Sequence, residues 1–255
     1  MSSLRDVTAP VFYAASDALV NDTVVISGSE GKHAATVRRL QIGEPIVVTD
    51  GLGRWVAGAV QSVEKRDRVI VSVHQRGTDT RPTPRIVVVQ AVPKGDRGET
   101  AVETLTEVGV DVITPWISER TQLRLDDERQ AKLLTRWRAS AREAAKQARR
   151  TWWPEVNDVV RRQAALDVVR SAAVALVLDA QAGTAIADMS FDVAGDIAVV
   201  IGPEGGLTPA EITDLVSVGA TPVRLGTSVL RTSTAGTVAA GVVLSRTARW
   251  SVDPA

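Results

Sequence analysis

Short apolar runs alternate with helix-like stretches along the chain after residue 85. The runs are continuous, which is typical of strands that are buried on both faces of a sheet. They are Ile86–Val89, Val112–Ile113, Ala173–Leu178, Ile197–Ile201 and Val223–Leu225. Helices are predicted near residues 102–110, 126–150, 208–218 and 235–248. Because strands that alternate with helices form a mostly parallel sheet, residues 86–255 are predicted to be an α/β domain.

The first 76 residues have a different pattern. β-Branched runs at 24–26, 46–48 and 69–73 are separated by glycine-containing turns, and one helix is expected near 33–40. Strands this short and evenly spaced indicate a small barrel or sandwich. Residues 77–85 are polar and contain Pro82 and Pro84, which disfavour a central strand. We therefore predict a small β domain over 1–76 and a linker over 77–85.

Composition excludes several classes of protein. Lysine plus arginine equals aspartate plus glutamate at 30 each, so any contact with nucleic acid must come from a local patch. There is no cysteine and there are only two histidines, so no metal site is expected. Residues 1–6 do not resemble the start of a signal peptide, and no apolar run approaches the length of a membrane span. We expect a cytoplasmic protein without a membrane partner.

A glycine-rich turn, Gly202–Gly206, directly follows the strand predicted at 197–201. Thr208, Pro209 and Glu211 then have the spacing of a helix N-cap with a capping box. Ligands of open α/β sheets bind beyond the carboxyl ends of strands, where this turn lies. The turn lacks the lysine and the spacing of phosphate-binding loops, which favours a ligand such as adenine. The alternative is a tight turn without a ligand.

A second loop, Leu225–Ala235, follows another short strand and is rich in glycine and hydroxyl groups. Two such loops at strand ends in one domain are better explained by one shared ligand than by chance. The helix that follows carries an apolar stripe, which indicates either core packing or a dimer contact. The stripe consists of Ala235, Val238, Ala239, Val242 and Val243.

These motifs resemble the RsmE family of SPOUT-class RNA methyltransferases. The family's first signature is similar to Gly202–Gly206 with Glu211, and its second to Leu225–Gly226 with Leu230–Ala235. Further similar segments occur in the same order along nearly the whole chain. They are His33 with Val37–Leu40, Pro93–Asp96, Thr106–Val110, Ser118–Arg120 and Glu143–Pro154. Ser233 occupies a position where the family usually has glutamate.

The resemblance implies a PUA-like β-barrel over residues 1–76 that binds RNA and a SPOUT trefoil-knot methyltransferase domain over residues 86–255. It also implies a homodimer that forms through the knot domains. The cofactor would be S-adenosyl-L-methionine, and the substrate would be N3 of a uridine in 16S rRNA of the small ribosomal subunit. The cofactor would lie among three loops, whose candidate residues are Leu178, Ile201, Gly202, Pro203, Glu204, Gly205, Gly206, Leu225, Gly226, Leu230, Arg231, Thr232, Thr234 and Ala235.

Two residues on these loops are candidates for the chemistry. Uracil N3 must lose a proton, and a guanidinium can stabilise the anion that results. Arg231 is the candidate for that role, and Glu204 is the candidate acceptor of the proton. Alternatively, the Glu204 carboxylate only bonds to backbone in its own turn.

Candidate RNA contacts come from three segments. On the helix predicted at 126–150, the basic residues Arg138, Arg142, Lys146 and Arg149 form one line, which fits either a phosphate backbone or a solvated flank. Arg150 and Trp152 follow it, and the adjacent Trp152 and Trp153 could stack on a base or pack against the protein. In the first domain the candidates are Arg38 and Arg39, with Arg5 as a weaker one.

Two alternative functions stay open at this point. One is a SPOUT methyltransferase that acts on a ribose 2′-oxygen of rRNA or tRNA. The other is an RNA-binding ribosome assembly factor that has kept the fold without catalysis, which Ser233 makes conceivable.

Overall fold

The computed structural model describes residues 9–122 and 126–251, so the candidate Arg5 lies outside the described residues. The chain forms two compact units. Of the described residues, the first contains 9–81 and 145–153, and the second contains 82–122, 126–144 and 154–251. No helix in the described ranges is both long enough and apolar enough to cross a membrane.

The first unit is built on one five-stranded sheet with the order β1-β3-β4-β5-β2. Its strands are β1 (Val11–Tyr13), β2 (Thr23–Ile26), β3 (Pro45–Thr49), β4 (Arg54–Glu64) and β5 (Arg68–Thr78). β1 and β3 are parallel and the other pairs are antiparallel. Strands β1 and β4 were not predicted. In β4 alanine and glycine at positions 57–59 weaken the β-strand pattern, so its pairing with β3 and β5 decides its structure.

Two short helical turns follow β2 and pack against the turn between β4 and β5. They are α1 (Gly28–Lys32) and the π-helical turn η3 (His33–Val37), and a 3-10 turn, η2 (Ala18–Val20), precedes β2. A Cβ atom on Gly31 would lie 2.0 Å from the carbonyl oxygen of Asp67, so only glycine permits this approach. The Thr36 hydroxyl also donates to the carbonyl oxygen of Arg66 at 2.9 Å.

Residues 145–153 complete the first unit although they are distant from it in the sequence. The Gly53 amide donates to the Thr151 carbonyl, and the Trp153 amide donates to the Gly51 carbonyl, both at 2.9 Å. The two indole rings lie against these glycines. A Cβ atom at Gly51 or Gly53 would come within 2.6 Å of the ring of Trp153 or Trp152, respectively.

The second unit contains one seven-stranded sheet whose neighbouring strands are all parallel, with the order β10-β12-β9-β11-β6-β7-β8. The strands are β6 (Ile86–Ala91), β7 (Val112–Trp116), β8 (Glu155–Val156), β9 (Val174–Leu178), β10 (Thr184–Ala185), β11 (Ile197–Ile201) and β12 (Ala220–Arg224). The α/β class predicted for this part of the chain is confirmed, and the parallel sheet fits the trefoil-knot domain that the resemblance implies.

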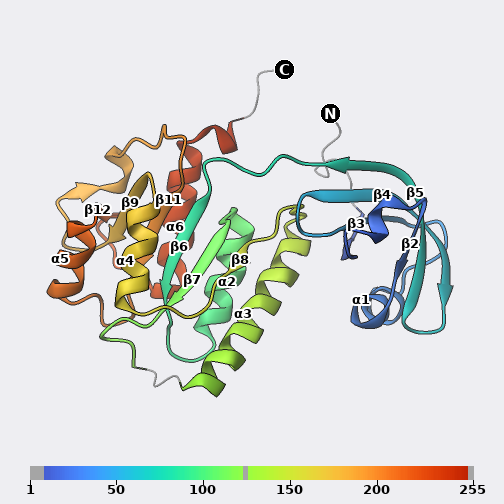
Figure 1. Ribbon diagram of the computed structural model, residues 1–255, viewed down its shortest axis with the longest axis horizontal. Coiled ribbons are helices and arrows are strands. Elements are labelled where there is room, and N and C mark those ends of the chain that lie inside the picture. Colours follow the sequence, from blue (N-terminus) through green and yellow to red (C-terminus); the bar gives the residue numbers. More distant parts are fainter. Residues whose placement is uncertain (1–8, 123–125, 252–255) are drawn as a thin grey trace. The chain divides into compact units, whose positions relative to one another are not determined.

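Helices cover both faces of this sheet (Figure 1). They are α2 (Arg97–Val108), α3 (Asp127–Gln147), α4 (Arg162–Ser171), α5 (Pro209–Ser217) and α6 (Thr232–Ser245), with short 3-10 turns η4 (Ile186–Asp188) and η5 (Ala248–Trp250). Side chains of α2, α3 and α6 pack in one buried cluster, and those of α4 and α5 pack in another. Successive strand residues such as Val88 and Val89 belong to opposite clusters, which explains the continuous apolar runs in the sequence.

The predicted start of α5 is confirmed. Thr208 is the N-cap, Pro209 opens the helix, and Thr208 and Glu211 form the capping box in both directions. α6 begins at Thr232, three residues before the predicted start, because the Arg231 carbonyl accepts from the amides of Thr234 and Ala235. The sequence analysis did not predict α4, whose fully buried side chains are only Ala165 and Val169.

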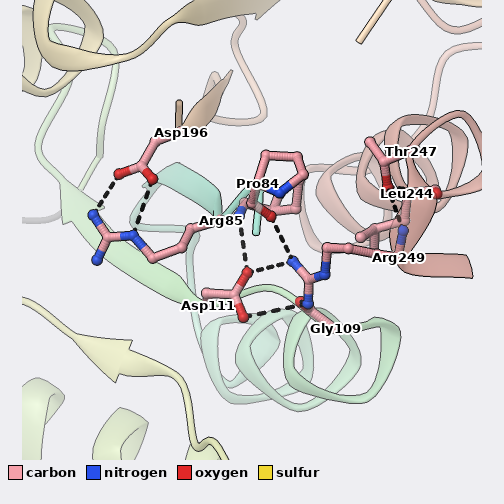
Figure 2. Close-up of polar contacts among 9 residues, drawn as sticks. Pro84, Arg85, Gly109, Asp111, Asp196, Leu244, Thr247 and Arg249 are labelled. Carbon is pink, nitrogen blue, oxygen red and sulfur yellow. Dashed lines mark hydrogen bonds and ion pairs between the residues drawn. The ribbon is translucent and has the colours of Figure 1, made fainter. Parts of the chain in front are cut away.

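A buried polar network joins the amino ends of β6 and β7 in the second unit (Figure 2). Asp111, just before β7, accepts from the Ile86 amide at 2.9 Å and from the Arg249 guanidinium at 2.5 Å. The same guanidinium donates to the carbonyls of Pro84 and Gly109 at 3.1 and 2.9 Å. This network holds the 3-10 turn η5 against the amino ends of β6 and β7.

A second ion pair, Arg85–Asp196, lies at the same end of the sheet. The hydrogen bond to Asp196 raises the pKa of Arg85 above its ordinary value.

Candidate functional site

A pocket lies beyond the carboxyl ends of the strands of the parallel sheet, at the end opposite to the Asp111 network. β12, β9 and β11 are neighbours in the sheet and run in the same direction, so the chain leaves all three at one edge. The segments that follow Leu178, Ile201 and Arg224 therefore meet there. This is the usual position of ligand sites in open α/β sheets.

The pocket has a volume of about 410 Å³, which is within the range of small-molecule sites. Most of the residues that line it are glycines or carry apolar side chains, and they come from the three segments. It is lined by Leu178, Asp179, Ala180, Ile201, Gly202, Pro203, Glu204, Gly206, Val223, Arg224, Leu225, Gly226, Thr227, Ser228, Val229, Leu230, Arg231, Thr232 and Ala235. Of the fourteen predicted cofactor residues, only Gly205 and Thr234 do not line it.

One hydrogen bond joins the two glycine-rich loops directly. The Thr232 hydroxyl, at the start of α6, donates to the carbonyl of Gly202. The side-chain amide of the buried Gln90 also holds the start of α6, because it donates to the Thr232 carbonyl at 3.4 Å. Gly236 faces the Ile201 side chain, and a Cβ atom there would lie 3.2 Å from the isoleucine methyl. The helix therefore comes close to β11 and holds the two loops around one space.

Glu204 is held by a segment that the sequence analysis did not connect with it. One carboxylate oxygen of Glu204 accepts from the Lys94 amide at 3.2 Å and lies 3.5 Å from the Arg97 guanidinium. These partners belong to the turn that begins α2, and not to the glutamate's own turn. At least one oxygen of this carboxylate therefore positions the glycine turn against α2.

Arg231 is an exposed residue on the wall of the pocket. Within the described ranges its guanidinium has no hydrogen-bond or ion-pair partner, whereas its carbonyl caps α6. The backbone is thus fixed while the cationic group is free to meet a ligand. This is the arrangement required to stabilise a developing negative charge.

Asp179 is a pocket residue that the sequence reasoning missed. It follows β9 directly, its amide donates to the Val223 carbonyl at 2.9 Å, and one of its carboxylate oxygens accepts from the Gln181 amide at 2.9 Å. The available signal was an acidic residue immediately after a buried strand. It gives the pocket a hydrogen-bond acceptor in addition to Glu204.

Two family models match the two parts of this chain. An RNA methyltransferase domain matches residues 80–244, and an RNA methyltransferase PUA domain matches residues 26–73. The chain belongs to the RNA methyltransferase family.

Curated relatives of this methyltransferase match it over most of its length. Ribosomal RNA small subunit methyltransferase E of Mycobacterium bovis is 40% identical over 249 residues, which are 96% of this chain and 95% of the relative. The Bacillus subtilis protein of the same name is 32% identical and aligns over 84% of this chain and 86% of its own. The resemblance to the RsmE family is thereby confirmed.

Solved structures agree with the sequence matches. Ribosomal RNA small subunit methyltransferase E of Neisseria gonorrhoeae, bound to S-adenosylmethionine, has a TM-score of 0.82 and 28% identity, and covers 93% of this chain and 97% of its own. A Legionella pneumophila protein, also solved with the bound cofactor, has a TM-score of 0.84 and 29% identity, and covers 94% and 98%. Both parts of the methyltransferase fold are included in these alignments.

Arg120 holds the glycine turn of this methyltransferase from outside the pocket. Its guanidinium donates to the carbonyls of Gly205 and Leu207 at 2.9 and 3.3 Å. The sequence analysis noted Ser118–Arg120 only as part of the resemblance. A charged donor on two carbonyls of a glycine-rich turn limits the conformations of that turn, which makes Arg120 a positioning residue.

We expect Arg120→Ala to weaken binding of S-adenosylmethionine about tenfold, because charge-assisted hydrogen bonds contribute about 1.5–3 kcal/mol. Isothermal titration measures this, with Arg170→Ala as the control, since Arg170 pairs with Asp167 on α4. Arg120→Lys should recover part of the affinity. An unchanged dissociation constant in Arg120→Ala would remove the positioning role.

The structure corrects one predicted RNA contact on α3. Lys146 is only 5% exposed and forms an ion pair with Glu30 at 2.9 Å, so it is not accessible to a phosphate. The prediction for Lys146 is wrong, because the sequence pattern of one helix cannot show which acid another segment supplies. Arg138 is exposed but is paired with Asp158 at 2.9 Å.

The remaining candidates near the end of α3 have different surroundings. Arg142 is exposed, whereas Arg149 and Arg150 are half-buried, and all three make contacts within the protein. The half-buried Trp152 donates from its indole nitrogen to the Asp79 carbonyl at 2.9 Å, and the Arg81 guanidinium lies 5.5 Å from the ring centre. These contacts support the packing interpretation of the tryptophan pair. Arg38 and Arg39 are both exposed.

Proposed function

We propose that this methyltransferase transfers a methyl group from S-adenosylmethionine to N3 of a uridine in 16S rRNA of the small ribosomal subunit. The observation that carries the proposal is the Thr232–Gly202 hydrogen bond, which closes two glycine-rich loops around one pocket at the carboxyl ends of β9, β11 and β12. The relatives named for small-subunit rRNA methylation support the substrate.

The pocket fits the chemistry of this cofactor. An adenosine group without phosphates is matched by apolar walls such as Leu178 and Leu230 and by backbone groups of the glycine turns. The carboxylates of Asp179 and Glu204 suit a ligand that carries positive charge and hydroxyl groups. We propose the fourteen loop residues predicted from the family as the cofactor-binding set, with Asp179 added. Arg231 belongs to this set through its backbone, which leaves its guanidinium to act at the base.

The cofactor supplies a methyl group that its sulfonium already activates, so the protein's main task is orientation, which can contribute roughly 7–11 kcal/mol. The chain's own contribution at the base is electrostatic. Arg231 presents a free guanidinium to stabilise the uracil anion formed when N3 loses its proton. Glu204 is the weaker candidate for proton acceptor, since one of its oxygens holds the Lys94 amide.

The other assignments follow from the same proposal. Residues 1–76 would bind RNA as the PUA-like domain, and residues 86–255 would carry the methyltransferase site. Residues 77–85 would link these two domains. A homodimer would form through the knot domains, for which the exposed apolar residues Val238 and Trp250 of α6 and η5 offer surface. An rRNA substrate places the protein in the cytoplasm.

The decisive experiment uses small subunits purified from a strain that lacks this protein. Incubation with the protein and labelled S-adenosylmethionine should place one methyl group on N3 of a uridine. Because N3 lies on the pairing edge of the base, the modification should stop reverse transcription at one position. A methyl group found on a ribose 2′-oxygen would contradict the base assignment.

Titration with S-adenosylmethionine tests the assembly-factor alternative. An active methyltransferase should bind the cofactor, and a factor whose loops have lost catalysis should not. The same titration of a Ser233→Glu variant shows whether the departure from the family pattern affects the pocket. If the wild-type protein fails to bind the cofactor, the proposed function is wrong.

A further inference from the structure

An exposed basic surface lies on the first unit where α1 and η3 meet the turn between β4 and β5. Its members are cationic side chains from two segments of the chain. We call it the basic turn surface, and it consists of Lys32, Arg38, Arg39, Lys65 and Arg66. Of these, only Arg38 and Arg39 were candidates from the sequence.

The two segments are in direct contact. The backbone of Gly31 approaches the Asp67 carbonyl so closely that a Cβ atom would lie 2.0 Å from it. Five residues later, the Thr36 hydroxyl donates to the Arg66 carbonyl at 2.9 Å. These contacts place the cations that follow Gly31 and Thr36 beside the cations of the β4–β5 turn.

The charge of this surface is not neutralised within the described residues. None of its five side chains has a hydrogen-bond or ion-pair partner in residues 9–122 and 126–251, and all five residues are exposed. The acids of the β4–β5 turn are Glu64, which pairs with Arg68 at 3.4 Å, and Asp67. Residues 31–43 contain no acid. Because the whole chain has no net charge, this is a local concentration of positive charge.

Two of the cations occupy backbone conformations that side chains rarely adopt. Arg39 has φ 54° and Lys65 has φ 57°, both in the left-handed region that favours glycine. Nothing in the described packing requires a long side chain at either position. A residue other than glycine at such a position is a reason to look for a function of its side chain.

We propose that the basic turn surface binds the phosphate backbone of the small-subunit rRNA. The inference rests on the proposed function for the choice of RNA. Unpaired arginine and lysine side chains displace counterions from phosphates, which gives affinity without sequence preference. The surface therefore positions the RNA, and selection of the base is left to the pocket.

The test is a variant that removes four cations without endangering the fold, Arg38→Gln/Arg39→Gly/Lys65→Gly/Arg66→Gln. Glycine at the two left-handed positions relieves the backbone, so the thermal midpoint should not fall. Binding to full-length transcribed 16S rRNA is measured at several KCl concentrations. Each lost phosphate contact lowers the slope of log K against log[KCl] by about 0.7, so the slope should fall by about 3 in the fourfold variant. The affinity at 0.1 M salt should fall on the order of a few hundredfold.

Single variants provide a matched control. Arg66→Gln should lower the slope by about 0.7, whereas Arg76→Gln should leave it unchanged, because Arg76 on β5 pairs with Asp22 at 2.8 Å. Cofactor affinity should be equal in all variants. Equal slopes for the wild type and the fourfold variant would overturn the proposal.

Two further outcomes distinguish this proposal from binding of a ribosomal protein and from the proposed function itself. If the fourfold variant binds free rRNA normally but binds assembled small subunits weakly, the occupant is a ribosomal protein and the RNA assignment is wrong. The proposed function is tested separately, because the slope measures RNA binding and needs no catalysis. The proposed function is wrong if the wild-type protein leaves small subunits unmethylated.

Discussion

Arg231→Ala should lower kcat for methylation of small subunits about 100- to 1000-fold while cofactor affinity stays close to that of the wild type. Removing one preorganised donor to a developing anion typically has an effect of this size. The guanidinium has no partner in the described structure, so its loss breaks no contact that holds the pocket. Single-turnover rates with saturating cofactor separate the chemical step from binding.

Two comparisons make the Arg231 result specific. Arg246→Ala removes the same side chain from the other end of α6, outside the pocket, and should leave the rate unchanged. Arg231→Lys keeps the charge but not the planar fork, so it should recover part of the rate. Higher pH should partly rescue Arg231→Ala, because hydroxide then forms the uracil anion unaided. Near-normal turnover in Arg231→Ala would disprove the role.

Arg249→Ala should destabilise the second unit by about 3–5 kcal/mol, because it leaves the Asp111 carboxylate buried without its counter-charge. Asp111 is 8% exposed, and the lost guanidinium also serves the carbonyls of Pro84 and Gly109. Urea unfolding followed by circular dichroism measures the change. Hydrogen exchange of the Ile86 amide, which donates to Asp111, should accelerate.

The neighbouring pair supplies the control for Arg249. Arg85 and Asp196 are each 29% exposed, so Arg85→Gln should cost about 1 kcal/mol or less. The double variant Arg249→Met/Asp111→Leu should regain much of the stability lost in Arg249→Ala, since the buried carboxylate is then removed together with the guanidinium that pairs with it. If Arg249→Ala unfolds at the same urea concentration as the wild type, the network does not stabilise the sheet edge.

The sequence by itself determined the features that depend on neighbouring residues. Continuous apolar runs specified strands buried on both faces, and Thr208 with Glu211 specified the start of α5. The glycine turn after β11 and the loop before α6 were expected to share a ligand, because two such loops at strand ends in one domain are better explained by one ligand than by chance. In the structure both loops line one pocket. These signals are local, so they can be recognised without knowing what other segments supply.

Only the tertiary structure decided the partners of charged and aromatic side chains. Lys146 matched a basic line on α3, yet Glu30, 116 residues away in sequence, buries it in an ion pair. Glu204 is 110 residues from the Lys94 amide that it accepts. Such pairs depend on which segments the fold brings together, and a charge pattern within one helix carries no information about the opposite charge. For the same reason the cations that remain unpaired, on the basic turn surface, were recognised fully only in the structure.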